Sequence, residues 1–314
     1  MLNSLYSGVS GMKGSQTKLD VIGNNIANVN TVGFKKGRVV FQDIINRNIG
    51  GAVAPTNVSG GVNPMQVGLG TRIASIDTVH TPGSPMSTYV GTDLAIDGEA
   101  FFVVSPENGG PNYLTKAGNF TRDANGYIVN SNGFFVMGVV QDEDGNPVTK
   151  AIKIVEDETI NQDGTGASGT DSDEKHMKFT SYSIDPNGYI IVVREDGKSG
   201  KLAMNDEGKY YMNDSDDKLN ENISIGTAVV ANPGGLTKVG NTMFAVTGNS
   251  GEADLNRIED NKGGTVISGV LEMSNVDLTE EFTEMIIAQR GFQANARTIT
   301  TSDSILEEIV NLKR

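Results

Sequence analysis

Apolar residues recur at alternating steps of three and four positions near both ends of the chain. Near the N-terminus this pattern contains Leu2, Leu5, Val9, Met12, Leu19 and Ile26. Near the C-terminus it contains Leu278, Phe282, Met285, Phe292, Ile299 and Leu306, with Ala296 and Val310. This spacing puts the apolar side chains on one face of an α-helix, as in the seam of a coiled coil. The sequence therefore predicts helices over about 2–26 and 278–313, the second capped by Asp277 or Thr279.

Two amphipathic helices of this kind allow more than one interpretation. Each helix can pack on a globular core, or the two can pair with each other or with other subunits. Terminal segments tend to be mobile unless they are docked. The position of both helices at the ends of the chain therefore favours pairing.

The middle of the chain is typical of β-structure. Short apolar runs predict strands at 94–96, 101–104, 113–114, 127–129, 134–140, 152–155, 183–185 and 189–193. Glycine-containing turns separate them at 125–126, 132–133, 144–145, 187–188 and 196–197. The predicted fold class is α+β, with terminal helices and mostly antiparallel all-β domains between them.

Three further segments have a distinct composition. The pattern D-x-N-G-Y-I occurs at 123–128 and again at 185–190, which predicts two similar hairpins. Residues 48–70 are rich in Gly, Pro and Asn and predict an extended connector. Residues 156–178 are acidic and poor in apolar residues, which predicts a loop or linker.

The composition excludes several kinds of site. The 314 residues include no cysteine, which excludes disulfides, thiolate metal sites and a cysteine nucleophile. The two histidines, His80 and His176, stand in polar surroundings without metal-site spacing, and both are expected near the surface. No phosphate-binding loop or nucleophilic-serine motif occurs, so the sequence predicts no enzyme, no cofactor and no metal. Asp142–Gly145 faintly resembles a calcium loop, but Lys153 would occupy its twelfth position, which favours a hairpin turn.

The net charge of −14 is distributed unevenly. Residues 1–75 carry seven Lys and Arg against Asp20 and Asp43, whereas residues 76–273 carry 14 basic and 30 acidic residues. An acidic middle argues against a nucleic-acid partner, which needs a basic surface. No apolar run approaches the roughly 18 residues of a membrane helix, so membrane insertion is not predicted. The N-terminus also lacks the pattern of a cleaved secretion signal.

The most unusual local feature is the run G-N-N-I-A-N-V-N-T-V-G-F-K at 23–35. Residue chemistry alone allows a helix end followed by turns, or a specific chain reversal that also bonds to neighbours. Together with L-D-V-I at 19–22 and A-Q-R-G-F-Q-A-N-A-R-T-I-T-T-S-D-S-I-L at 288–306, the run resembles the bacterial flagellar rod and hook protein family. Shorter motifs at 68–70, 93–98, 101–102, 115–120 and 232–236 resemble its β-domain landmarks. The family motif is carried here by Asn24, Asn25, Asn28, Gly33, Phe34, Gln289 and Arg290.

This resemblance implies a domain order. Residues 1–30 with 275–314 would form a terminal helical coiled-coil domain, and 31–75 an extended connector. Residues 76–141 with 226–274 would form an inner β-domain, and 142–225 an outer β-domain insertion. The apolar positions of both helices would then be the assembly seam of a helical homopolymer.

The resemblance also implies partners and a location. The partners would be further copies of the chain, the rod, hook-cap and hook–filament junction proteins, and the flagellar type III export apparatus. The location would be an extracellular appendage, reached without a Sec signal.

Within the family, L-D-V-I-G-N-N at 19–25 and the C-terminal ending are similar to the hook branch, and the compact length resembles hooks from Gram-positive bacteria. Distal rod proteins more often carry Met and Ala in place of Leu19 and Gly23. The implied function is therefore a subunit of a curved tubular joint that transmits torque from rod to filament. The alternative is a distal rod protein, which builds a straight driveshaft, and a remote alternative is a calcium-binding adhesin module.

Overall fold

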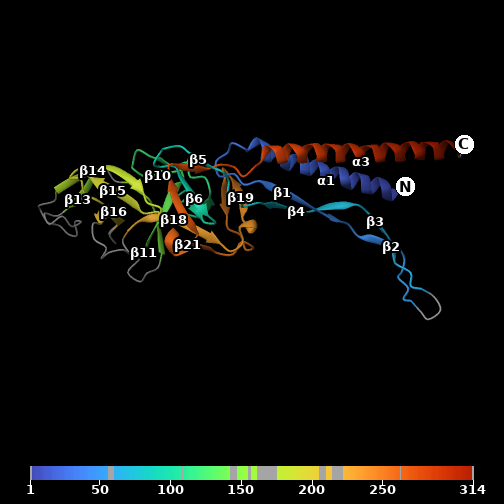
Figure 1. The fold of residues 1–314 in the computed structure, drawn as a ribbon, viewed down its shortest axis with the longest axis horizontal. Helices are drawn as coiled ribbons and strands as arrows, with labels where there is room; N and C mark the ends of the chain where they lie inside the picture. The colour runs from blue at the N-terminus through green and yellow to red at the C-terminus, as the bar shows by residue number, and fades with distance from the viewer. Residues whose placement is uncertain are drawn as a thin grey trace. The chain divides into compact units, whose positions relative to one another are not determined.

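The chain is α+β, with a helix near each end and mostly antiparallel β-structure between them (Figure 1). The computed structural model describes residues 2–55, 60–107, 109–141, 147–154, 157–160, 175–204, 210–213, 222–261 and 263–312. The chain divides into two compact units. We call the first the helical unit (Met1–Val29, Lys35–Val79 and Val276–Arg314) and the second the β unit (Asn30–Phe34 and His80–Asn275).

Two long helices dominate the helical unit. Helix α1 spans Leu2–Ala27 and helix α3 spans Leu278–Leu312, which confirms both predicted helices to within two residues. They lie side by side (Figure 1). Asp277 caps α3, because its Oδ1 accepts the Thr279 N–H at 2.7 Å and the Glu280 N–H at 3.4 Å. No helix in the described part of the chain is both long and apolar enough to cross a bilayer.

The C-terminal half of α3 contains a run of hydroxyl side chains that bond to their own helix. Thr298, Ser302 and Ser304 donate to carbonyl oxygens three or four residues earlier, each at 2.7 Å. Thr300 and Thr301 both donate to the carbonyl of Arg297, at 3.0 and 2.9 Å. Such back-bonding gives backbone carbonyls a second donor, which weakens and often bends a helix.

The helical unit also contains a narrow β ribbon. Strand β1 (Gly37–Asp43) pairs with β4 (Thr71–Thr78), and β2 (Asn46–Gly50) pairs with β3 (Met65–Gly68), both antiparallel. A bridge between Val53 and Val62 continues the pairing. The segment predicted as an extended connector is therefore largely a paired ribbon. The sequence analysis did not predict these strands, because the segment is rich in Gly, Pro and Asn, which are generally depleted in strands.

The β unit is built from antiparallel sheets. Within the described residues, the largest sheet has ten strands. Eight of them follow one path, in the order β19 (Thr237–Gly240), β20 (Met243–Ala245), β8 (Tyr113–Thr115), β7 (Phe101–Ser105), β18 (Ser224–Val230), β11 (Phe135–Gln141), β10 (Ile128–Val129) and β9 (Thr121–Arg122). The other two strands lie off this path, because β12 (Pro147–Ala151) pairs with β11 and β21 (Ala253–Arg257) pairs with β18.

Three smaller sheets and two short helical segments complete the β unit as described. A five-stranded sheet runs in chain order through β13 (Asp157–Ile160), β14 (Lys175–Ile184), β15 (Ile190–Arg194), β16 (Ser199–Met204) and β17 (Tyr210–Asn213). Two-stranded sheets join β22 (Gly264–Ser268) to β6 (Leu94–Gly98) and β23 (Val270–Glu272) to β5 (Pro85–Ser87). The short segments are η2 (Pro233–Gly235) and α2 (Ile258–Asn261).

The repeated D-x-N-G-Y-I pattern forms two turns with the same hydrogen bonds. In the first, Gly126 N–H donates to Asp123 O at 3.1 Å and Asp123 N–H donates to Tyr127 O at 2.9 Å. In the second, the equivalent bonds join Asp185, Gly188 and Tyr189 at 2.8 and 2.9 Å. Both glycines have φ near +80°, which a glycine adopts without steric cost. The prediction of two similar hairpins is confirmed.

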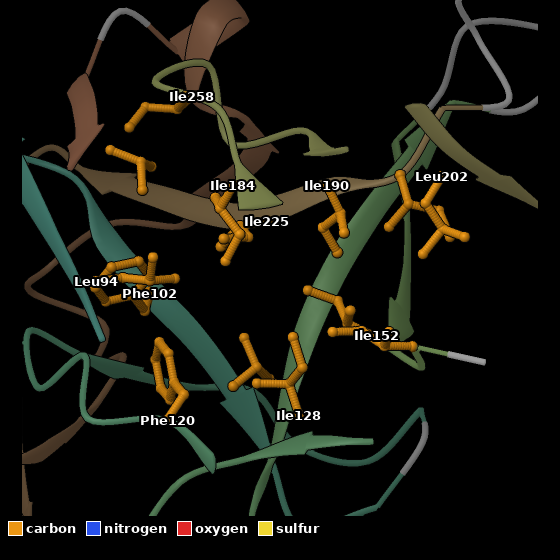
Figure 2. Close-up of a cluster of buried hydrophobic side chains, with 14 of the residues drawn as sticks. Leu94, Phe102, Phe120, Ile128, Ile152, Ile184, Ile190, Leu202, Ile225 and Ile258 are labelled. Carbon is orange, nitrogen blue, oxygen red and sulfur yellow. The ribbon is translucent and has the colours of Figure 1, made fainter. Parts of the chain in front are cut away.

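The main hydrophobic core lies in the β unit and draws on both of its larger sheets (Figure 2). Phe102 and Phe120 pack edge to face, with ring centroids 5.2 Å apart. Ile190 and Leu202, from the five-stranded sheet, belong to the same buried cluster. Residues of this cluster come from both sides of the boundary predicted between the inner and outer β-domains. The position of that boundary stays a prediction.

Some local predictions differ from the structure. The strand predicted at 152–155 is instead β12 at Pro147–Ala151, since Ile152 and Ile154 are buried without continuing it. His80 is half-buried, and its ring packs against the rings of Phe101 and Phe244, with centroids 5.7 and 5.4 Å away. The calcium-like segment 142–145 lies outside the described residues, as do much of the acidic segment 156–178 and the side chain of His176.

Candidate functional site

The two helices of the helical unit meet along a face made of small and polar residues of α1. A Cβ atom added at Gly8 would lie 3.1 Å from Thr298 Oγ1, and one added at Gly11 would lie 2.7 Å from Asn295 Nδ2. A Cβ atom at Gly291 would lie 3.5 Å from Ser15 Oγ. The helices therefore approach closely because both carry glycine where they touch. Residues later in α1 contact residues earlier in α3, so the two helices are antiparallel.

Charged and amide side chains continue this contact face toward the end of α1. Lys18 pairs with Glu284, and Asn25 Nδ2 donates to Glu281 Oε2 at 3.2 Å. Ile22 lies between these two pairs along α1 and is 4% exposed. The contact face of α1 is the row Gly8, Gly11, Ser15, Lys18, Ile22 and Asn25.

This contact face has the predicted spacing but lies one position away from the predicted apolar seam. Val9 and Phe292 are each more than one-third exposed, Leu278 is 39% exposed and Phe282 is 50% exposed. The other seam residues are partly buried, namely Leu5, Met12, Leu19, Ile26, Met285, Ile299 and Leu306. Steps of three and four describe several faces of one helix, so periodicity alone does not select the face that meets the partner. The seam's role in assembly stays a prediction.

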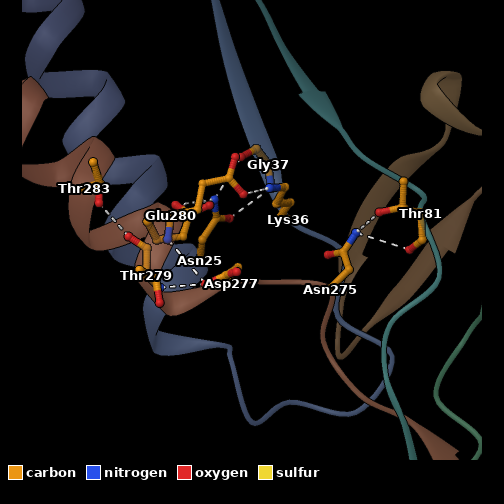
Figure 3. Close-up of polar contacts among 10 residues, drawn as sticks. Asn25, Lys36, Gly37, Thr81, Asn275, Asp277, Thr279, Glu280 and Thr283 are labelled. Atoms are coloured by element: carbon orange, nitrogen blue, oxygen red, sulfur yellow. Dashed lines mark hydrogen bonds and ion pairs between the residues drawn. The ribbon is translucent and has the colours of Figure 1, made fainter.

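The amide of Asn25 ties three elements together at the base of the helix pair (Figure 3). Its Nδ2 donates to Gly37 O at 2.9 Å, and its Oδ1 accepts the Gly37 N–H at 2.9 Å, in addition to the bond with Glu281. Asn25 is 2% exposed and Glu281 is 5% exposed. A two-way amide bond to one residue fixes both position and orientation, so Asn25 sets where β1 leaves the helices.

Further polar contacts surround Asn25. Lys36 Nζ lies 2.8 Å from Glu280 Oε2, next to the capped start of α3 (Figure 3). A cavity of about 280 Å³ opens here between α1, β1 and α3. Its lining includes three basic and three acidic side chains, and two pairs among them are joined as ion pairs. This balance of charge favours a structural junction over a site for an ionic ligand.

The pKa of Asp277 is lowered mainly because the Thr279 N–H donates to its carboxylate, with a second bond from the Glu280 N–H. The nearby Lys36 acts in the same direction. Hydrogen bonds to the charged form of a carboxyl group favour ionisation. The start of α3 is therefore a local site of stable negative charge.

Comparison with known proteins identifies the family to which this chain belongs. Residues 5–35 match the family described as flagella basal body rod protein, and residues 267–312 match the flagellar basal body rod FlgEFG protein C-terminal family. Residues 95–192 match the flagellar hook protein FlgE/F/G D1 domain. The chain is 42% identical, over 315 aligned positions covering both chains completely, to the flagellar basal-body rod protein FlgG of Bacillus subtilis strain 168. The chain belongs to the flagellar hook and rod protein family.

Two relatives in this family come from one organism and allow a matched comparison. Against the flagellar hook protein FlgE of Borreliella burgdorferi the chain is 32% identical over an alignment of 443 positions. Against the flagellar basal-body rod protein FlgG of the same organism it is 31% identical over 322 positions, so the two identities are nearly equal. Both alignments cover the whole of both chains. The names describe structural parts of the flagellum, not enzymes, and this chain is a structural protein of the flagellum.

The hook and rod family motif at the N-terminus is divided between the two units. Asn28 Nδ2 donates to the backbone and side-chain oxygens of Asn24, both at 2.8 Å, where α1 ends. Gly33, in the β unit, has φ +69° and donates its N–H to Glu272 O at 2.8 Å. A Cβ atom at Gly33 would lie 2.5 Å from Ala117 N, so that close approach requires glycine.

The remaining residues of the family motif belong to both units, with Phe34 in the β unit and Gln289 and Arg290 in the helical unit. Phe34 lies under the Lys238 ammonium, which is 4.9 Å from its ring centroid, and burial lowers the pKa of Lys238. Gln289 and Arg290 are exposed on α3. Sequence reasoning missed the contacts of Gly8 and Gly11, because apolar spacing carries no signal for a contact made through glycine.

Proposed function

We propose that this chain is the hook subunit, which polymerises into a curved tube that transmits torque from the rod to the filament. The observation that supports it best is the sequence L-D-V-I-G-N-N at 19–25, which resembles the hook branch of the family, and the chain is also 32% identical to a hook protein over the whole of both chains. Leu19 and Gly23 also resemble the hook branch of the family.

The geometry suits a polymer in which the helices form the inner part. Half-exposed Phe282 and Leu278 on α3 are available to copies of the chain, because the contact with α1 uses a different face. Burying one large apolar side chain contributes about 1.5–3 kcal/mol. Contacts of this kind that do not close into a ring generate a helical assembly. In this proposal α1 and α3 pair as a coiled coil and line an export channel.

The proposed outer part is the β unit, with the segment 142–225 furthest from the axis. The segment 142–225 carries most of the net negative charge of the chain, which suits a solvated surface. Polar outer contacts exchange partners more readily than a packed apolar interface. Such exchange would let the tube curve while the helical part resists twist.

The proposed partners are other copies of the chain, the rod, hook-cap and hook–filament junction proteins, and the flagellar type III export apparatus. The proposed location is the extracellular part of the flagellum next to the basal body. These partners are the ones implied by a hook subunit within this family.

A distal rod protein is the second candidate. It is favoured by the 42% identity, over complete chains, to the relative named FlgG rod protein from Bacillus subtilis. A rod subunit would build a straight, stiff driveshaft from the same helix pair.

Electron microscopy of basal bodies from a strain lacking this gene distinguishes the two. Complete rods without hooks are expected for a hook subunit. Truncated rods would make the chain a rod protein, and normal basal bodies with hooks would exclude both. Reintroduction of the intact gene on a plasmid is the control, because it restores the missing structure only when the defect belongs to this chain.

A further inference from the structure

A strained and exposed aromatic residue stands in the loop between β5 and β6. Tyr89 is 93% exposed, and its backbone has φ 59°, in the left-handed region. That conformation is unfavourable for a residue with a side chain, because Cβ approaches the following carbonyl oxygen. Strain in a folded chain clusters at sites of function. An aromatic ring left in water adds nothing to the stability of the isolated chain.

Hydrogen bonds hold this loop in place. The N–H groups of Thr88 and Tyr89 both donate to Gly269 O, at 2.8 and 3.2 Å. The Gly269 N–H donates to Asp93 O at 2.8 Å, and Ser268 Oγ donates to Gly91 O at 3.0 Å. The loop is therefore anchored to the turn between β22 and β23. A ring displayed on an anchored loop loses little conformational freedom when it binds.

The segment that contains Tyr89 and the segment that anchors its loop are both uncharged. Residues 81–92 and 263–271 contain no Asp, Glu, Lys or Arg, whereas the β unit as a whole has 14 basic and 29 acidic residues. Met86, Val90 and Ile267, in the same two segments, are exposed apolar residues. Like-charged surfaces repel one another, so two copies of the β unit approach with least repulsion through an uncharged surface.

We propose that Tyr89 is a contact residue between neighbouring copies of this chain, with its ring buried against the next copy in the polymer. The proposal rests on the proposed function only in requiring that the chain polymerises, as a hook or as a rod. The occupant is a second copy because an uncharged surface on a strongly acidic unit suits a partner of the same charge. Buried tyrosines surrounded by weaker contacts are typical hot spots of interfaces.

The absence of cysteine from the chain allows a direct test of burial. The variant Tyr89→Cys carries a single thiol, and its rate of reaction with a water-soluble maleimide is measured in monomer and in polymer. Val148→Cys, at an exposed apolar residue of β12 in the same unit, is the matched control. We expect the thiol at position 89 to react about tenfold more slowly in the polymer, and the control thiol to change much less. Equal protection at both positions would overturn the proposal.

A second variant separates an interface role from a structural one. Tyr89→Gly relieves the backbone strain and removes the ring. The monomer is expected to unfold at the same or a higher temperature, and the critical concentration for polymerisation is expected to rise about tenfold. A lower unfolding temperature with an unchanged critical concentration would assign Tyr89 a structural role instead.

The control for this second test is Val148→Ser, which is expected to leave the critical concentration unchanged. If the unmodified chain forms no polymer, the proposed function fails and this inference fails with it. If the unmodified chain polymerises and Tyr89→Gly has the same critical concentration, only this inference is overturned.

Discussion

Asn25 of α1 and Glu281 of α3 are hydrogen-bonded at the base of the helix pair, with Nδ2 donating to Oε2 at 3.2 Å. Both side chains are almost fully buried. The same amide also bonds in both directions to Gly37 at the start of β1. One residue of the family motif thus connects both helices and the β ribbon, which gives the motif a structural role that can be tested.

Replacing this amide should destabilise the helical unit. Asn25→Leu keeps the branched shape of the side chain but leaves buried polar groups of Gly37 and Glu281 without this partner. The expected loss of unfolding free energy is about 2 kcal/mol, since an unsatisfied buried polar group costs about 1–3 kcal/mol. Urea unfolding followed by circular dichroism measures it. Gln16→Leu, at an exposed position of α1, should change the value by less than about 0.5 kcal/mol, and equal effects would contradict the role of Asn25.

Two glycines of the N-terminal region should respond oppositely to alanine. Gly23 lies inside α1, and a Cβ atom there meets nothing within 4 Å, so Gly23→Ala should stabilise the chain by about 1 kcal/mol. Gly33 has φ +69° and only 2.5 Å between an added Cβ and Ala117 N. Gly33→Ala should therefore cost about 3 kcal/mol or more, combining left-handed strain with overlap against backbone. Thermal unfolding of both variants measures the signs, and a loss at Gly23 would contradict the open environment found there.

The N-cap of α3 predicts a specific dependence on pH. The carboxylate of Asp277 has a lower pKa when it accepts the N–H bonds of α3 than when the chain is unfolded. Its contribution to stability is therefore fully present at a pH above about 3.9, the ordinary pKa of an aspartate. The contribution is lost as the pH falls through the lowered pKa of the folded chain. Asn caps a helix about as well but does not titrate. Between about pH 5 and pH 2, the urea midpoint of Asp277→Asn should consequently fall less than that of the unmodified chain, and parallel curves would exclude the effect.

Two positions of α3 should separate folding from assembly. Phe282 belongs to the predicted seam and is 50% exposed, whereas Ala288 is 5% exposed. Phe282→Asp should leave the unfolding free energy of the monomer within about 0.5 kcal/mol and block polymerisation, because it places a charge where copies are proposed to pack. Ala288→Asp buries a charge and should destabilise the monomer by several kcal/mol. Urea unfolding and sedimentation of assembled material distinguish them. Normal polymer from Phe282→Asp would show that the seam is not used.

Local sequence rules predicted the parts of the fold that depend on neighbours in the chain. Asp277 marked the start of α3, and the repeated Asn-Gly pairs marked the turns at Gly126 and Gly188. These features follow from capping and from backbone conformations that only a few residues adopt. The same rules require no knowledge of the rest of the molecule.

Features that depend on distant partners were harder to predict. The β ribbon pairs residues of β1 with residues of β4 that lie 28 to 41 positions later, and its composition resembles a loop. The ring of His80 packs against Phe101 and Phe244, which lie 21 and 164 positions later in the chain. The helix contact face was displaced by one position because glycine and polar side chains form it. Hydrophobic spacing carries no signal for contacts of that kind.

The hydroxyl run of α3 has a mechanical consequence for a polymer that is curved. In a rotating bent tube each subunit passes from the inner to the outer side of the bend once per revolution, so its length along the axis must change repeatedly. The hydroxyls of Thr298, Ser302 and Ser304 give backbone carbonyls in this half of α3 a second donor, which weakens the helix there. In a curved polymer, changes of subunit length would therefore concentrate in this softer half of α3.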